Sequence, residues 1–432
     1  MACPYAKDDK RICIIGAGPA GVSAMYHFAQ MANFPEMVCY DKQGRWGGMW
    51  NYTWRTGTDK YGEPCFNAMY KRLQINSPKE VLEFPDYSYR EHFGRRVPSY
   101  LYRGEMLDYM EGRWTDNSRC DLRQFIRFGT AVRHVAFDDD SGNFKVTVND
   151  LEKGSYHEET FTHVIVAVGL YNHPCLPEFP GIDSFEGRVL HARDFRDDFE
   201  FRNQKVLVIG NAMSGQDIAF HIMKGGGQKV YLGYKNVPSP YKWPETIVEK
   251  GPISCFNRRR VQFADGSSDE IDSVVFCTGY NSIYPFMENR LRITCKSTLY
   301  LKDVYKGCLY MPQGDNRLFY VGAVRGLVGL SLIDCLAAWT ARYINEQTLE
   351  KQVSEDEMRA YVDKWMAKAM GIREHADIVT YQCELMADLA KSSGYGMQYT
   401  LSLPLFLEWI KHRNDDVWTY RDHQFTSMYT GD

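Results

Sequence analysis

The feature that most constrains this chain is a glycine loop that joins a predicted strand to a predicted helix. The β-branched run Arg11–Ile15 is typical of a strand, and the apolar period of residues 20–31 is typical of a helix. Between them, residues 16–21 follow the pattern Gly-x-Gly-x-x-Gly. Its glycines permit a tight turn, close approach of the backbone to a pyrophosphate, and close packing of helix on strand. The pattern predicts an α/β fold that begins with a Rossmann-like, dinucleotide-binding unit.

An acidic residue and a pair of glycines follow this loop. A second predicted strand, residues 37–40, ends at Asp41, which lies 20 residues beyond Gly21. A carboxylate at this place accepts hydrogen bonds from a ribose hydroxyl. Gly47 and Gly48, in the stretch RWGGMW, permit a second close approach of the backbone to the same nucleotide. The cofactor-binding residues predicted in this unit are Gly16, Gly18, Pro19, Ala20, Gly21, Asp41, Lys42, Gln43, Gly48, Met49 and Trp50.

A second unit of the same kind begins near the middle of the chain. A strand over Lys205–Ile209 precedes a loop at residues 210–215, and a helix over residues 214–224 and a strand over residues 229–234 follow. This loop keeps the first and third glycines, but Ala212 adds a methyl group where the second glycine would face a phosphate. The pattern therefore predicts a second nucleotide-binding unit.

In the second unit, the residue that corresponds to Asp41 is a base. Lys235 lies 20 residues beyond Gly215, and a cation there favours a nucleotide with a 2'-phosphate. The alternative is an ordinary surface lysine. The first unit thus suits the ADP half of FAD, and the second suits NADPH. The predicted NADPH-binding residues are Gly210, Met213, Ser214, Gly215, Lys235, Asn236, Thr278 and Gly279.

Two strands that end in glycine, at Val168-Gly169 and Thr278-Gly279, mark the places where the chain passes between the units. We predict two Rossmann-like domains. A discontinuous FAD-binding domain covers residues 1–170 and 281–432, and an inserted NADPH-binding domain covers residues 171–280. Other predicted strands cover residues 131–137, 144–148, 164–168, 273–277 and 318–322, and other predicted helices cover residues 332–343, 355–370 and 378–389.

Composition and cysteine spacing argue against several other classes of protein. The net charge is −4 and charged residues are 25% of the chain, so we expect neither nucleic acid nor an anionic membrane surface as a partner. We expect no signal peptide, because the N-terminus lacks an apolar h-region. We expect no membrane insertion, because no apolar run reaches the roughly 18 residues of a span. The 12 cysteines contain no C-x-x-C pair. This argues against a metal site and favours reduced thiols in the cytoplasm.

Three stretches together resemble the flavin-containing monooxygenases. They are the first glycine loop, the Gly-Gly-x-Trp stretch, and residues 185–195, which fit the fingerprint F-x-G-x-x-x-H-x-x-x-(F/Y). Baeyer-Villiger relatives usually end this fingerprint with Trp, so Phe195 favours the branch that oxidises heteroatoms. The resemblance covers essentially the whole chain. It is closest to the short, soluble branch of bacterial trimethylamine monooxygenases and insect pyrrolizidine alkaloid N-oxygenases, whose features residues 51–57, 241–245 and 276–280 share.

This resemblance implies a mechanism and a role for single residues. NADPH would reduce FAD, O2 would add to the flavin as a C4a-hydroperoxide, and the nitrogen of a tertiary amine would take one oxygen atom. Asn76 matches the active-site asparagine of the family, and its alternative role is to form a turn before Ser-Pro. Met213 stands where relatives often have Asn or Tyr, which leaves uncoupled NADPH oxidation open. His191 is expected to shape the hinge between the domains and not to act as a base.

Several other functions stay open at this point. A sulfide S-oxygenase, a Baeyer-Villiger-type monooxygenase and a largely uncoupled NADPH oxidase use the same cofactors. A flavin disulfide reductase also has two dinucleotide units, but it needs a redox-active cysteine pair that this chain lacks. A redox-sensing protein without enzymatic activity is a further alternative. We expect a small amine or sulfide and O2 as partners, and a homo-oligomer that packs through the aromatic-rich C-terminal region.

Overall fold

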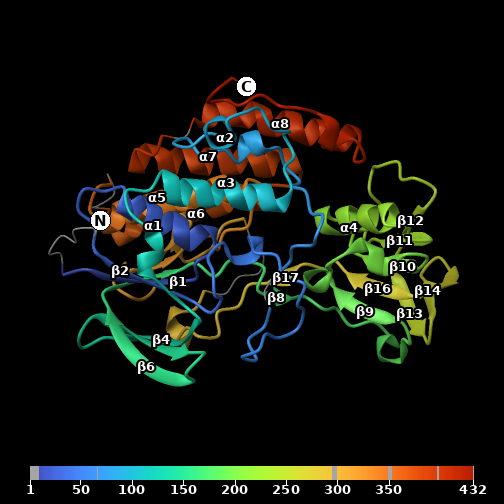
Figure 1. The fold of residues 1–432 in the computed structure, drawn as a ribbon, viewed down its shortest axis with the longest axis horizontal. Coiled ribbons are helices and arrows are strands. Elements are labelled where there is room, and N and C mark those ends of the chain that lie inside the picture. Colours follow the sequence, from blue (N-terminus) through green and yellow to red (C-terminus); the bar gives the residue numbers. More distant parts are fainter. Residues whose placement is uncertain (1–8, 66, 294–298, 349–352, 397, 432) are drawn as a thin grey trace.

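Two β-sheets, the larger mixed and the smaller parallel, are each covered by helices and form the framework of the molecule (Figure 1). A computed structural model describes residues 9–65, 67–293, 299–348, 353–396 and 398–431. The larger sheet has seven strands in the order β18-β19-β20-β7-β1-β2-β3, and the smaller has five in the order β12-β11-β10-β16-β9. The strands of the smaller sheet lie between residues 188 and 276, and those of the larger lie on both sides of that stretch. The predicted α/β class with two Rossmann-like units is confirmed.

The larger sheet forms around the first glycine loop. Its central strand β1 (Arg11–Ile15) lies between β2 (Glu36–Asp41) and β7 (His163–Val166) and runs parallel to both. Residues 12–14 are fully buried, as a strand covered on both faces requires. The sheet is completed by β3 (Ile126–Phe128), β18 (Val304–Tyr305), β19 (Leu309–Tyr310) and β20 (Leu318–Tyr320).

The smaller sheet repeats this plan around the second glycine loop. Its central strand β10 (Lys205–Ile209) runs parallel to β11 (Lys229–Gly233) on one side and to β16 (Ser273–Phe276) on the other. The helix α4 (Met213–Lys224) follows the loop and packs against β10 and β11. The outer strands are β9 (Arg188–His191) and β12 (Ile247–Lys250).

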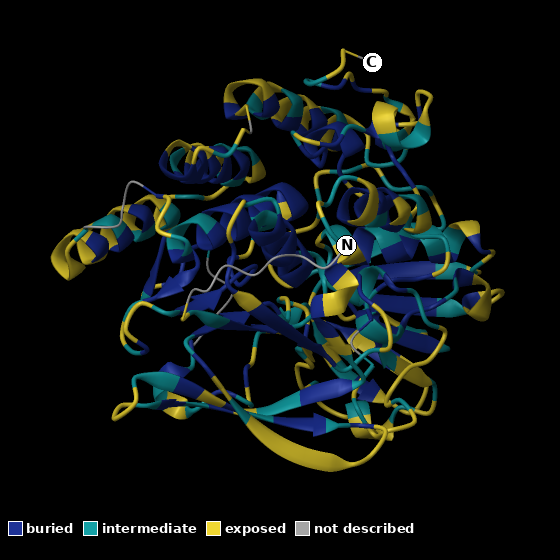
Figure 2. Cartoon of the chain, turned by 60° about the vertical axis from the view of Figure 1, so that its left-hand side comes forward, coloured by how far each residue is buried: buried dark blue, intermediate teal, exposed yellow. Residues whose placement is uncertain are grey.

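Three small antiparallel sheets complete the strand structure. One of them, the pair of β8 (His173–Pro174) and β17 (Tyr280–Asn281), joins the two stretches of chain that connect the larger sheet to the smaller one. Figure 2 shows that the outermost strand of another, β6, is largely exposed. The remaining strands are β4 (Thr130–Asp138), β5 (Asn143–Asp150), β6 (Ser155–Phe161), β13 (Ile253–Asn257), β14 (Arg260–Phe263) and β15 (Ser268–Glu270).

Helices cover the larger sheet in successive layers. The helix after the first loop, α1 (Pro19–Ala29), packs on α5 (Gly329–Ile344), which contacts α7 (His375–Ser393), and α7 in turn contacts α8 (Tyr399–Asp415; Figure 1). Among the described residues, no helix has the length and apolar character needed to cross a bilayer. The other helices are α2 (Tyr89–Phe93), α3 (Arg103–Asp116) and α6 (Glu355–Met370), with 3-10 turns η1 (Gly48–Trp50), η2 (Lys79–Val81), η3 (Leu122–Phe125), η4 (Ile182–Ser184), η5 (Ala192–Asp194), η6 (Asp198–Phe201), η7 (Asn289–Leu291) and η8 (Tyr420–Asp422).

The predicted elements are present, and several of their ends were wrong. The helix predicted over residues 20–31 ends at Ala29, and those predicted over residues 332–343 and 378–389 extend further in both directions. The strands predicted over residues 164–168, 273–277 and 318–322 end at Val166, Phe276 and Tyr320, because the chain turns through left-handed glycines just beyond them. Ends elsewhere agree to within two residues. Several elements were not predicted, among them the strands β6 and β9 and the helices α3 and α8.

Candidate active site

The first glycine loop has the geometry that its sequence predicts. Gly16 adopts a φ of +103°, and its amide donates to the carbonyl of Tyr40 at 2.8 Å. A Cβ atom on Gly21 would lie 1.9 Å from the carbonyl oxygen of Gly16. Only glycine permits α1 to pack this closely on the loop. Pro19 and Ala20 form the first turn of α1, in which no side chain of the described structure caps the helix. Their position leaves the helix N-terminus available to a phosphate.

The double glycine lies directly against this loop. A Cβ atom on Gly48 would lie 2.9 Å from the Cα atom of Gly18, and the amide of Gly47 donates to the carbonyl of Ala17 at 2.8 Å. Met49 and Trp50 follow in the 3-10 turn η1 and are partly buried. The predicted residues of the first unit are therefore brought together, and the cradle has no side chain where a pyrophosphate would lie. The geometry fits the ADP half of FAD.

Asp41 ends β2 beside the loop and is 8% exposed. Its two carboxylate oxygens accept from the amides of Ala17 and Gln43, each at 2.7 Å. Burial raises the pKa of Asp41, against these hydrogen bonds and the charge of Lys42. A carboxylate has about four acceptor sites, so two remain for a ribose hydroxyl. The ammonium of Lys42 points elsewhere, to the carbonyl of Pro64 at 2.9 Å.

The second glycine loop has nearly the same backbone. Gly210 adopts a φ of +110°, and a Cβ atom on Gly215 would lie 1.7 Å from the carbonyl oxygen of Gly210. Ala212 has φ −81° and ψ −175°, against −77° and −176° at Gly18. The substitution of Ala for the middle glycine therefore does not distort the loop. Met213 and Ser214 begin α4, at the end that would face a phosphate.

Lys235 and Asn236 follow β11 at the edge of the second loop, and both are exposed. Within the described part of the chain, no ion-pair partner is found for the ammonium of Lys235. It is therefore available to a 2'-phosphate. Thr278 and Gly279 lie where the chain leaves the smaller sheet, and the hydroxyl of Thr278 and the carbonyl of Gly279 bond to the main chain of Cys175.

His191 also lies at this crossing and is held in one tautomer. Its Nε2 donates to the carbonyl of Gly279 at 3.1 Å, and its Nδ1 accepts from the amide of Arg193 at 3.1 Å. Burial lowers the pKa of His191 to about 4. Both ring nitrogens of a neutral imidazole are thus occupied. A positioning role, and not that of a base, agrees with the sequence-based expectation.

The two units meet at Asn76 and Met213. The Nδ2 atom of Asn76 lies 3.4 Å from the Sδ atom of Met213, which is the first residue of α4. Asn76 is exposed toward a small pocket. Residues of both units and of the C-terminal segment line this pocket, among them Asn76, Met213, Phe220, Trp243, Tyr420 and Arg421. The structure thus places the predicted catalytic asparagine beside the second glycine loop.

A partly buried ionic group beside this pocket was not predicted from the sequence. Arg421 pairs with Asp217 of α4 at 2.8 Å and donates to the carbonyl of Ile75 at 3.2 Å, and Tyr70 donates to the same aspartate. The pKa of Arg421 is raised, because Asp217 outweighs the opposing effect of burial. Arg421 lies in a C-terminal stretch whose sequence shows only a polar and aromatic character. No motif there signals that it reaches the cleft.

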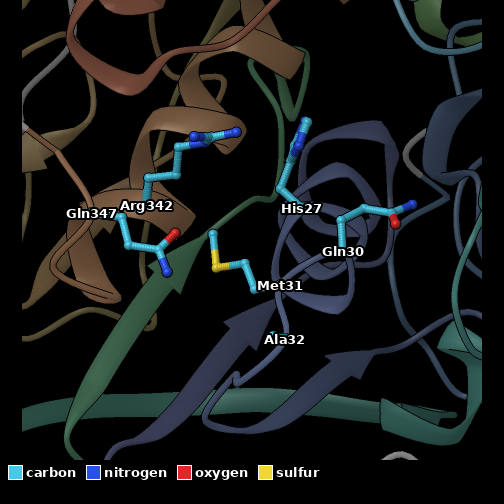
Figure 3. Close-up of a pocket in the computed structure, with 6 residues that line it drawn as sticks. All are labelled: His27, Gln30, Met31, Ala32, Arg342 and Gln347. Atoms are coloured by element: carbon cyan, nitrogen blue, oxygen red, sulfur yellow. The ribbon is translucent and has the colours of Figure 1, made fainter.

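Figure 3 shows a second pocket, at the C-terminal ends of α1 and α5. It contains none of the predicted site residues. The C-terminal ends of helices carry a partial negative charge, which disfavours phosphates. The pocket is therefore distinct from the nucleotide sites; it is lined by His27, Gln30, Met31, Ala32, Arg342 and Gln347.

Comparisons with known proteins agree with this geometry. The sequence profile of the family described as Flavin-binding monooxygenase-like matches residues 9–237 and 244–397. A trimethylamine monooxygenase of Methylocella silvestris is 39% identical over 426 residues, which cover 98% of this chain and 93% of the relative. A senecionine N-oxygenase of Tyria jacobaeae is 24% identical over 374 residues, which cover 85% of this chain and 78% of the relative.

A solved structure extends the similarity to three dimensions. The crystal structure of Tmm from a Pelagibacter species superposes with a TM-score of 0.94 at 34% identity. The match covers 98% of this chain and 95% of the other. The likeness thus includes both sheets and the C-terminal helices.

Proposed function

Since the chain belongs to the flavin-binding monooxygenase-like family, we propose that it oxygenates the nitrogen of a tertiary amine with NADPH and O2. The observation that carries this proposal is the contact between Asn76 and Met213, at 3.4 Å. It brings a polar amide from the first unit to the N-terminus of the helix that follows the second glycine loop. Two nucleotides bound at the two loops would meet at this place.

The residues near the two loops suit different parts of the two nucleotides. The cradle of Gly16, Gly18 and Gly48 suits a pyrophosphate, and Asp41 beside it suits a free ribose hydroxyl. Lys235 at the second loop suits a 2'-phosphate. When bound, FAD supplies the redox chemistry by which NADPH and O2 are used, and the protein supplies orientation and a dry site.

Asn76 provides a polar group where oxygen transfer would occur. Its amide donates through Nδ2 and accepts through Oδ1, so it can hold a proton donor and a proton acceptor at one point. In the structure, Nδ2 faces a thioether, which is a weak acceptor and leaves this donor available to a better partner. The Met213 side chain closes one wall of the pocket. No nucleophilic side chain is required for the transfer.

We further propose that the FAD-binding domain consists of residues 1–170 and 281–432 and that residues 171–280 form the NADPH-binding domain. The membership of the two sheets supports these bounds, because no strand of one sheet falls within the range of the other. The separate buried cores on β10 and on β1 support them as well.

An assay for two products tests the proposed reaction. Purified protein, loaded with FAD, would be given NADPH and O2 with either trimethylamine or dimethyl sulfide, and N-oxide and sulfoxide would be counted against NADPH consumed. We expect N-oxide in near-equal amount to NADPH. Sulfoxide alone would identify an S-oxygenase, and NADPH loss with neither product would identify an oxidase.

A matched pair of variants tests the role of Asn76. Asn76→Ala should lower the N-oxide formed per second by about 100-fold, the typical cost of removing one preorganised donor. Its flavin content should equal that of the wild type. Asn257→Ala, an exposed asparagine on β13, serves as the control and should change neither quantity.

The compartment and assembly are also proposals. All ten cysteines that the structure describes are free thiols, which supports a reducing compartment such as the cytoplasm. We propose in addition a homo-oligomer that packs through the C-terminal region. Light scattering on the purified protein would show a single chain mass if this assembly does not form.

A further inference from the structure

Outside the cleft, three potential metal ligands lie together on the C-terminal part of the chain. Glu408 and His412 lie one turn apart on α8, and His423 follows the short turn η8. One ligand atom from each residue lies within 4.8 Å of the others. These three residues are the single group of this kind in the described residues. Each of the three side chains is between 34% and 47% exposed, so an ion and its water can reach them.

Two spacings of these ligand atoms are close to those of a tetrahedral metal. The Glu408 carboxylate oxygen lies 3.3 Å from Nε2 of His423 and 3.7 Å from Nε2 of His412. A tetrahedron with metal–ligand bonds of about 2.0 to 2.1 Å has edges of roughly 3.3 to 3.4 Å. Rotation of the side chains would bring all three atoms to one ion.

The two imidazole rings lie beside each other. The rings of His412 and His423 stack at 3.7 Å with an interplanar angle of 25°. Phe425, which is 3% exposed, packs edge-on against both of them. Both rings must turn out of this stack to bind one ion, because the ion lies in the plane of each imidazole that binds it.

From this geometry we propose a binding site for a divalent transition metal of the Zn2+ class, formed by Glu408, His412 and His423. Two neutral imidazoles and one carboxylate are borderline ligands that Zn2+ prefers, and a water completes the tetrahedron. Each imidazole binds through Nε2 and carries its proton on Nδ1. The proposal does not depend on the oxygenation reaction, because none of the three residues lines the cleft.

A metal bound at this site would link the C-terminal segment to α8. His423 lies two residues after Arg421, which pairs with Asp217 and donates to the carbonyl of Ile75. Gln424 and Phe425 continue the segment, and both bond to Ser99. A metal held by residues on both sides of the turn stabilises the folded segment, since it binds the folded form only.

Titration of the flavin-loaded protein with Zn2+ tests the site. Calorimetry should show one saturable equivalent, and His412→Gln and His423→Gln should each weaken it by at least about tenfold. His134→Gln, an exposed histidine on β4, is the matched control and should bind as the wild type does. Equal flavin content and melting temperature without Zn2+ would establish that the variants are folded. Glu408→Gln provides a third variant with the shape of the side chain kept.

Two further measurements locate the ion. Anomalous scattering at the zinc edge should place it among the three side chains, and Zn2+ should slow hydrogen exchange in residues 416–425 of the wild type alone. Saturable binding that survives both histidine substitutions would overturn the proposal. So would a lack of saturable binding at Zn2+ concentrations below about 1 mM.

Discussion

Asp41 and Lys235 each lie 20 residues beyond the last glycine of their loop, and they carry opposite charges. Their places beside the strands differ: Asp41 is the last residue of β2, and Lys235 lies two residues beyond the end of β11. Asp41 is buried and engaged by two backbone amides, whereas Lys235 is exposed. The acid suits a free hydroxyl and repels a phosphate, and the base does the reverse. We propose that this pair of side chains gives each loop its own nucleotide.

Lys235→Ala should therefore change the choice between NADPH and NADH. We expect the KM for NADPH to rise by about 10- to 100-fold, because a hydrogen bond to a charged group contributes about 1.5–3 kcal/mol. The KM for NADH should change little, because NADH has no 2'-phosphate. Steady-state kinetics with both nucleotides measure this. Lys224→Ala, at the opposite end of α4, is the control. An equal loss with both nucleotides would contradict the assignment.

The glycines of a loop serve different ends, and the structure separates them. Gly21 has no room for a methyl group, since its Cβ would meet the Gly16 carbonyl at 1.9 Å. Gly18 has room, with the nearest atom, Cα of Gly48, at 3.7 Å. Gly21 is therefore needed for helix packing, and Gly18 is needed only where a ligand approaches.

Alanine substitutions at these two glycines should therefore have different effects on folding and on flavin content. Gly18→Ala should fold normally and lose most of its FAD, while Gly21→Ala should be destabilised by about 1–3 kcal/mol or more, as for overpacked sites. The ratio of flavin to protein absorbance and the melting temperature of the flavin-free protein distinguish the two effects. Gly44→Ala, with no atom within 4 Å of its new Cβ, should match the wild type in both. A flavin-loaded Gly18→Ala protein would show that the backbone does not approach the cofactor there.

Prediction from sequence succeeded where periodicity and loop chemistry agree. The strand β1, the loop and α1 have both signals, and the structure confirms their order and position, with α1 ending two residues earlier than predicted. The strand β6 was missed because its sequence, SYHEETF, is polar and six of its seven residues are not buried. The helix α8 was missed because it contains Pro404 and its apolar residues do not keep one face.

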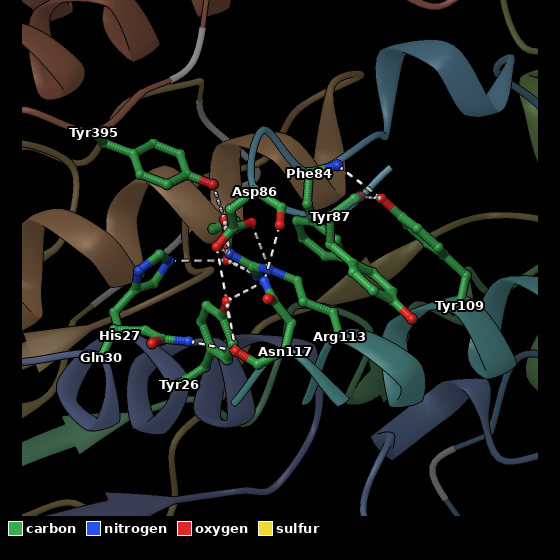
Figure 4. A network of polar contacts seen from close by, with 11 residues as sticks. Tyr26, His27, Gln30, Phe84, Asp86, Tyr87, Tyr109, Arg113, Asn117 and Tyr395 are labelled. Atoms are coloured by element: carbon green, nitrogen blue, oxygen red, sulfur yellow. Dashed lines mark hydrogen bonds and ion pairs between the residues drawn. The ribbon is translucent and has the colours of Figure 1, made fainter. Parts of the chain in front are cut away.

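Helices distant in sequence are joined by a buried ionic cluster (Figure 4). Arg113 of α3 is fully buried and pairs with Asp334 of α5 at 2.8 Å and with Asp86 at 2.9 Å. His27 of α1 and Tyr395 also bond to Asp334. Burial alone would raise the pKa of Asp334, but Arg113 and His27 hold it well below its usual range.

Removal of the guanidinium should destabilise the fold in a pH-dependent way. The depressed pKa of Asp334 contributes stability above about pH 4, its unfolded value, and this is lost as the pH falls further. Arg113→Met should therefore cost about 3–5 kcal/mol at neutral pH, and the difference from the wild type should narrow in acid. Thermal unfolding across a pH series measures this. Arg359→Met removes an exposed pair with Glu355 and should cost no more than about 1 kcal/mol; an equal cost for both variants would contradict the role of burial.

The C-terminal segment packs against the second unit, and no sequence pattern predicted this packing. Residues 413–421 reach from the helical layers to the second unit. Arg413 donates to Tyr241 at 3.0 Å and to Gln216 of α4, and Trp418 donates to the carbonyl of Lys242 at 2.9 Å. Such contacts join residues far apart in sequence, so local propensity and spacing do not encode them. The cleft of Asn76 and Met213 therefore depends on a segment that follows both glycine loops by some 200 residues or more.

Arg421→Met tests whether the packing of the C-terminal segment affects the reduction of the flavin by NADPH. The substitution breaks the pair with Asp217 and the bond to the carbonyl of Ile75, which precedes Asn76, and leaves both glycine loops intact. Flavin content should stay unchanged, while NADPH should reduce the flavin about 10- to 100-fold more slowly, because small misplacements of reacting groups are costly. Anaerobic stopped-flow absorbance gives this rate constant directly. Arg373→Met, an exposed arginine before α7, should reduce at the wild-type rate. If Arg421→Met does so as well, the segment supports only the fold, since α4 then keeps its place beside Asn76 without it.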